Sequence, residues 1–153
     1  MAKSQVKAQS SFEYMLIVAL TFAIIIPATY LFYSYSKDSS QEITDAQITK
    51  LGRNIVDSAE KIYYSGLGSK TIADLNVPDG VISAVIIDGK ELVFNVSSNI
   101  GISEVVFFSS VNMTASPQYC TANVCSLPGL SSPGLKKVKI EVLVKDSVNI
   151  DTL

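Results

Sequence analysis

The N-terminal part of the chain contains a long stretch without any charged residue, and this stretch limits what the chain can fold into. It runs from Tyr14 to Ser36, 23 residues, and reads YMLIVALTFAIIIPATYLFYSYS. As an α-helix it would be roughly 35 Å long, which exceeds the hydrocarbon core of a bilayer, about 30 Å. The sequence therefore predicts a membrane-spanning helix near the N-terminus.

The remainder of the chain has a different character. Residues 37–153 contain 10 basic and 13 acidic residues, a mildly acidic balance. Only 17% of the 153 residues are charged, and no basic patch of the kind that binds nucleic acid stands out. The composition predicts a membrane segment joined to a folded domain of ordinary size, with no nucleic-acid partner.

The residue types present argue against most enzyme classes. The chain has no His, so Ser-His-Asp triads and His-containing metal sites are excluded, and its two cysteines are too few for a four-thiolate zinc site. No Gly-rich phosphate loop is visible either. We expect no enzyme activity, no metal and no cofactor.

Three interpretations fit an apolar N-terminus that follows lysines: a cleaved secretory signal, a simple anchor, and an anchor whose acidic residue has a function. The uncharged run is longer than the usual signal-peptide core of about 7–15 residues. No convincing small-x-small cleavage site follows it, and Glu13 stands at its start. These features favour the third interpretation.

The residues before the run read Lys7-Ala8-Gln9-Ser10-Ser11-Phe12-Glu13. This segment resembles the class III signal peptide of archaeal type IV pilin-like proteins. The resemblance implies that a prepilin peptidase cuts between Ala8 and Gln9 on the cytoplasmic side. It also implies that Glu13, the fifth residue of the cut chain, pairs with the new terminal ammonium of a neighbouring subunit and sets the stagger between helices.

The expected fold class is α+β, with four segments along the chain. These are a leader over 1–8, an apolar assembly helix over 9–36, an amphipathic continuation over 37–66 and a β-rich head over 67–153. Within the helix, Pro27 removes one hydrogen bond and predicts a kink. The apolar stripe of the second half predicts packing against a small antiparallel sheet, and the resemblance implies the lollipop plan of pilins. The stripe consists of Ile43, Ala46, Ile48, Leu51, Ile55, Val56, Ala59, Ile62 and Tyr63.

Period-2 patterns after residue 68 predict four to five strands in an antiparallel meander, beginning near Thr71, Val81, Glu91, Ile102 and Lys137. Asp88-Gly89 predicts a two-residue hairpin. In the strand over 137–145, Val138, Ile140, Val142 and Val144 are expected on one face. Residues 109–136 are expected to be irregular.

Both cysteines lie in that irregular segment. Cys120 and Cys125 enclose four residues, which in an extracellular domain favours a disulfide, whereas a reducing habitat would leave two thiols. Two N-glycosylation motifs occur, Asn95-Val96-Ser97 and Asn112-Met113-Thr114. Asn112 is the stronger candidate, because Asn95 lies at the end of an expected strand.

Together with these observations, the resemblance implies a structural subunit of an archaeal type IV pilus-like surface filament that serves adhesion. Before assembly it would be a single-pass membrane protein with a cytoplasmic N-terminus and an extracellular head. Its partners would be the membrane, the prepilin peptidase and identical or related pilin subunits. The alternatives are a membrane-anchored surface binding protein that does not polymerise and a minor or priming pilin, while an archaellin is a variant of the filament interpretation.

Overall fold

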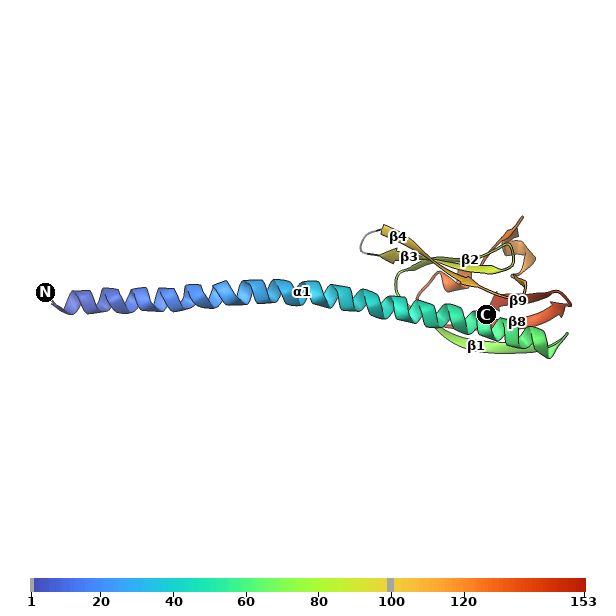
Figure 1. Ribbon diagram of the computed structural model, residues 1–153, viewed down its shortest axis with the longest axis horizontal. Coiled ribbons are helices and arrows are strands. Elements are labelled where there is room, and N and C mark those ends of the chain that lie inside the picture. The colour runs from blue at the N-terminus through green and yellow to red at the C-terminus, as the bar shows by residue number, and fades with distance from the viewer. Residues whose placement is uncertain (1, 99–100) are drawn as a thin grey trace. The chain divides into compact units, whose positions relative to one another are not determined.

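One helix occupies the first two fifths of the chain. The computed structural model describes the backbone of residues 2–98 and 101–153 and the side chains of residues 12–37, 39–98 and 101–153. Helix α1 covers Ala2–Ser65, and β-strands follow it (Figure 1). The predicted α+β class with a long N-terminal helix and antiparallel sheets is confirmed.

The chain forms two compact units, Met1–Gln41 and Glu42–Leu153. The first unit is helical throughout its described part, and the helix passes through Pro27 without a break. The hydroxyls of Thr21 and Thr29 donate to the carbonyls of Ile17 and Ile25, at 2.7 Å and 2.8 Å. The second unit combines the second half of α1 with all of the strands.

The described residues form nine strands in two sheets. The order is β1-β8-β9-β5 in the first sheet and β4-β3-β2-β7-β6 in the second. The strands are β1 Lys70–Val77, β2 Val81–Ile87, β3 Glu91–Ser98, β4 Gly101–Phe108, β5 Met113–Thr114, β6 Cys120–Thr121, β7 Val124–Ser126, β8 Gly134–Val144 and β9 Ser147–Thr152, with 3-10 turns at Pro117–Tyr119 and Pro128–Leu130.

The single meander predicted from the sequence is therefore wrong. β1 pairs antiparallel with β8, with Lys70 opposite Glu141 and Val77 opposite Gly134, and not with β2. The Pro78-Asp79-Gly80 turn leads the chain into the other sheet, where β2, β3 and β4 do form a meander. Local periodicity finds strands but not their partners, because long-range pairing depends on the whole fold.

The segment over 109–136 is also more ordered than predicted. It contains β5, β6 and β7, and it adds strands to both sheets. β7 pairs with β2, and β5 pairs with β9 in parallel, with Met113 opposite Val148. The segment thus contributes strands to both sheets and connects them.

The core of the second unit lies between the two sheets and the second half of α1 (Figure 1). Five helix residues are buried in it: Ile48, Leu51, Ile55, Val56 and Ala59. Phe94 of β3 and Ile140 of β8 are fully buried there as well. Most of the predicted helix stripe is thereby confirmed, but its first two residues, Ile43 and Ala46, are exposed.

Two local predictions need correction. Val144 was expected on the buried face of β8 but is 61% exposed, because the register between β8 and β9 shifts after Glu141. The β2–β3 hairpin has a three-residue loop, since Ile87 pairs with Glu91 and Lys90 stays outside the ladder. Asp88 and Gly89 have φ values of 50° and 68°, the left-handed conformation that this dipeptide favours.

At Gly52, α1 lies close against the second sheet. A Cβ at this position would overlap the ring of Phe107 in β4, which in turn packs edge-on against Phe94 at 6.1 Å between ring centroids. The glycine is needed for space and not for backbone freedom. It lets β4 pack directly on the helix.

We therefore expect Gly52→Ala to destabilise the second unit. The overlap with Phe107 costs about 1–3 kcal/mol, which outweighs the gain of up to about 1 kcal/mol from replacing a helical glycine. Urea unfolding of the full chain in detergent measures the difference. Thr49→Ala, on the exposed helix face, is the control and should stay within about 0.5 kcal/mol of the parent. A Gly52→Ala protein as stable as the parent would contradict this account of the contact.

Candidate functional site

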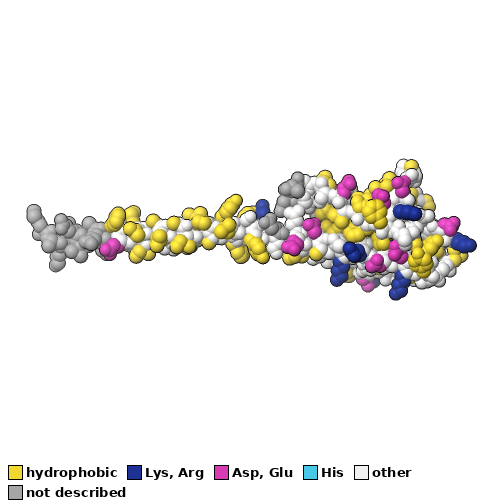
Figure 2. All heavy atoms as spheres, in the orientation of Figure 1, with side chains coloured by type: hydrophobic (Ala, Val, Ile, Leu, Met, Phe, Trp, Pro, Cys, Tyr) yellow, Lys and Arg dark blue, Asp and Glu magenta, His cyan; other side chains and the backbone are white. Residues whose placement is uncertain are grey.

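The apolar half of α1 is uncovered in the single chain. Between Phe12 and Ser36 the large hydrophobic side chains other than Val18 are exposed, from 51% at Ile25 to 75% at Tyr35. The most apolar 18-residue window has a mean hydropathy of 2.3, and none of it is buried. Figure 2 shows hydrophobic side chains along the visible face of this part of the helix. This helix is long and apolar enough to cross a membrane.

Glu13 is the only charged residue between Phe12 and Ser36. Its side chain is exposed in the single chain, so the fold of the chain provides no cover for it. Ala8 and Gln9, the predicted cleavage residues, lie within the helical backbone, and their side chains are outside the described residues. The structure therefore places Glu13 one helical turn after Gln9, at the start of the apolar surface.

The other end of the apolar surface carries aromatic residues and a cation. Tyr30, Tyr33 and Tyr35 are all exposed, and the ammonium of Lys37 lies 5.1 Å from the centroid of the Tyr33 ring. Tyrosines and a lysine at the end of an apolar helix are typical of a membrane–water interface.

The two cysteines form a disulfide in the structure. Cys120 and Cys125 face each other across the β6–β7 pair, with 3.9 Å between their Cα atoms. Ala122, in the turn between these strands, has a φ of 52°. By the chain-entropy model, closing so short a loop stabilises the fold by about 2 kcal/mol.

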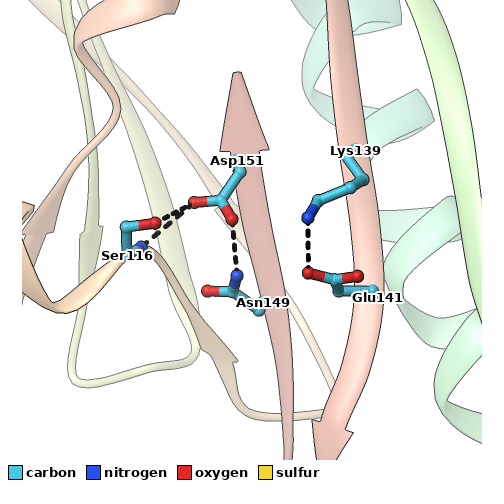
Figure 3. A network of polar contacts seen from close by, with 5 residues as sticks. All are labelled: Ser116, Lys139, Glu141, Asn149 and Asp151. Carbon is cyan, nitrogen blue, oxygen red and sulfur yellow. Dashed lines mark hydrogen bonds and ion pairs between the residues drawn. The ribbon is translucent and has the colours of Figure 1, made fainter. Parts of the chain in front are cut away.

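A polar network fixes Ser116, just before this hairpin, to strand β9 of the first sheet (Figure 3). One carboxylate oxygen of Asp151 accepts hydrogen bonds from the backbone N–H and the hydroxyl of Ser116. Its other oxygen accepts from the Asn149 amide at 2.7 Å. Both carboxylate oxygens of Asp151 therefore accept hydrogen bonds, one from Ser116 and the other from Asn149.

A lysine–glutamate pair of β8 lies beside this network. The Lys139 ammonium is 2.6 Å from Glu141, and this contact raises the pKa of Lys139. The lysine therefore stays protonated, which makes it a poor nucleophile. Among the described residues, no group of three or more His, Cys, Asp or Glu side chains is arranged to bind a metal.

The two glycosylation motifs have different surroundings. Asn95 lies in β3, between β2 and β4, and its amide nitrogen donates to the Ser83 hydroxyl at 2.9 Å. Its amide oxygen is buried without a partner among the described residues. A sugar on Asn95 would have to fit on a half-buried side chain in the middle of a sheet, and it would leave only one N–H for the hydrogen bond to Ser83.

Asn112, by contrast, is exposed. Val111, Met113 and Ala115 are buried while Asn112 points outward, so this short segment is extended with alternating faces. The carbonyl of Asn112 accepts from Val148 N–H at 2.8 Å, and Met113 N–H donates to the Gly89 carbonyl at 2.6 Å. These two hydrogen bonds hold the backbone at Asn112 and Met113, while the Asn112 side chain stays exposed. Apolar and polar residues alternate over 111–115 in the sequence, and this pattern could have predicted that Asn112 is exposed.

Comparison with known proteins finds no matching family model, no matching curated protein and no matching solved structure.

Glu60 joins the last turns of α1 to the segment that leads to Asn112. Its carboxylate accepts hydrogen bonds from the backbone N–H and the hydroxyl of Ser110, at 2.9 Å and 2.8 Å. These hydrogen bonds, the backbone one foremost, favour the ionised form and lower the pKa of Glu60 below its ordinary 4.5.

A lowered pKa in the folded state means that Glu60 stabilises the fold above about pH 4.5, and that this stabilisation is lost as pH falls through the folded pKa. We expect Glu60→Gln to lower the free energy of unfolding at pH 7 and to differ much less from the parent near pH 3. Denaturant unfolding at both pH values tests this. Asp57→Asn, an exposed acid one turn earlier, is the control and should have little effect at either pH. An equal effect of Glu60→Gln at both pH values would argue against the proposed hydrogen bonds.

Proposed function

We propose that this chain is a structural subunit of an archaeal type IV pilus-like surface filament. A prepilin peptidase would cut it between Ala8 and Gln9, and the subunits would polymerise through the apolar half of α1. Before assembly this half would hold the chain in the membrane as a single span, with the N-terminus in the cytoplasm and the second unit outside the cell.

The uncovered apolar surface of α1 over residues 12–36 is the observation that carries this proposal. A helix that is apolar on all sides needs lipid or other helices around it. The described residues of the first unit supply neither, since none of the most apolar window is buried. A lipid-embedded precursor and a bundle of such helices in a filament are two states that would both cover it.

Glu13 is the feature that favours a filament over a simple anchor. A carboxylate inside the apolar layer costs at least about 2.5–3.5 kcal/mol at the bilayer centre, less near the interface, so it favours a cationic partner. Cleavage before Gln9 would create such a partner, the terminal ammonium of a neighbouring subunit. This pairing would also fix how far one helix is displaced along the next.

The principal alternative is a surface binding protein that keeps the anchor and does not polymerise, or a minor or priming pilin. The second unit would then be displayed singly or at low copy number. Glu13 separates the filament subunit from the surface binding protein that does not polymerise, because an anchor that does not assemble has no use for a charge at this depth.

We expect Glu13→Ala to reduce the amount of this protein in sheared surface material by at least about tenfold, while the amount in the membrane fraction is maintained. Loss of an ion pair worth about 1.4 kcal/mol per contact suffices for this ratio. Quantitative blotting of both fractions measures it. Glu42→Ala, an acidic residue of the same helix beyond the apolar half, is the matched control and should leave the sheared fraction unchanged.

The N-terminus of the protein recovered from cells tests the cleavage itself. A chain that begins at Gln9 and is abundant in sheared material supports a filament subunit, and one that begins at Gln9 but stays in membranes supports the minor or priming pilin. An intact leader in the mature protein would refute the prepilin proposal.

A further inference from the structure

The last turn of α1 borders an open polar pocket in the second unit, which we call the tyrosine pocket. Its volume is about 500 Å³. It lies between the end of the helix, the β2–β3 hairpin, the chain before β5 and the β8–β9 turn. Its main lining residues are Tyr63, Tyr64, Lys90, Ser110, Asn112 and Asp146.

Two neighbouring tyrosines give this pocket an aromatic surface. Tyr63 is half-buried against the core, and Tyr64 meets it edge-on, with 5.5 Å between the ring centroids. Tyr64 itself is 75% exposed. A large aromatic ring left in water can gain free energy when an apolar surface covers it.

The polar groups of the pocket have unused hydrogen-bonding capacity. Within the described chain, no hydrogen bond or ion pair engages the Lys90 ammonium, the Asp146 carboxylate or the Asn112 side-chain amide. A ligand that suits this site combines an apolar ring face for tyrosine with several hydroxyls for lysine and carboxylate. A pyranose sugar has both.

The chain has an attachment point for such a sugar at the pocket itself. Asn112 lies on the lining of the pocket and is the first residue of the Asn-Met-Thr motif for N-glycosylation. Its neighbours Val111 and Met113 point into the core, which holds the Asn112 side chain at the pocket. Asn95, the other motif, has its amide nitrogen bound to Ser83 in the middle of a sheet.

We propose that Asn112 carries an N-linked glycan whose first sugars lie in the tyrosine pocket, against Tyr64 and within reach of Lys90 and Asp146. A membrane glycosyltransferase would form the bond between the Asn112 side-chain nitrogen and the anomeric carbon of a lipid-pyrophosphate-linked sugar. The lipid pyrophosphate leaves with the bonding electrons, and the amide loses one proton. The glycan then covers Tyr64 and stabilises the end of α1 against the hairpin.

This inference rests on the part of the proposed function that places the second unit outside the cell, and it does not require polymerisation. Glycan occupancy and filament formation are measured separately. A chain that starts at Gln9 and enters filaments with Asn112 unmodified overturns the inference and leaves the filament proposal standing.

The test uses the full chain, purified in detergent from cells that N-glycosylate exported proteins. Peptide mass mapping should find a sugar on Asn112 and none on Asn95. Thermal unfolding is then compared for the parent, Asn112→Gln, Tyr64→Ala and the double variant. We expect Asn112→Gln to lower the unfolding midpoint by on the order of 4 °C in the parent, and by much less when Tyr64 is Ala.

Two further backgrounds serve as controls for the same Asn112→Gln change. In Tyr64→Phe the ring is kept, so the full shift should remain. Leu67 is an exposed apolar residue of the same region that does not line the pocket. In the Leu67→Ala background the full shift should therefore also remain. An unmodified Asn112, or an equal shift with and without the Tyr64 ring, would overturn the proposal. Tyr64 is so exposed that its replacement should not prevent folding.

Discussion

One helix has to meet two different solvation requirements, and the rest of the structure depends on this constraint. Between Tyr14 and Ser36, α1 is apolar on all sides, and none of its most apolar window is buried in the single chain. From Ile48 onward only one stripe is apolar, and that stripe is buried by the sheets of the same chain. The boundary between the two compact units, at Gln41 and Glu42, falls between these regions. The first half therefore needs partners from outside the chain, whereas the second half is satisfied within it.

Close packing between α1 and β4 is what allows the second half to serve as part of a core. Gly52 leaves room for the Phe107 ring, and Phe107 contacts Phe94 of β3 in turn. Near the end of the helix, Glu60 adds a charge-assisted pair of hydrogen bonds to Ser110. Together these contacts hold one edge of the second sheet on the helix, and they place residues 110–112 beside Tyr63 and Tyr64.

The segment over 109–136 shows why the sequence was only partly informative. Its prolines, serines and glycines indicate turns, and the chain does turn repeatedly there, with 3-10 turns at Pro117 and Pro128. However, its strands are two or three residues long, too short for periodicity to reveal. They form because longer strands pair with them: β7 lies antiparallel beside β2, and β5 lies parallel beside β9. The Asp151–Ser116 hydrogen bonds and the Cys120–Cys125 disulfide then fix this path.

The sequence by itself determined the long helix, its division into an apolar and an amphipathic half, and the position of the main strands. These features follow from local periodicity and from the absence of charge between Tyr14 and Ser36. Only the tertiary structure decided that the strands form two sheets, that Val144 lies outside the core, and that Asn112 and Tyr64 share a pocket while Asn95 is held within a sheet. The physical reason is that pairing, register and burial arise from contacts between residues far apart in the chain, and a local pattern contains no information about which distant residue completes it.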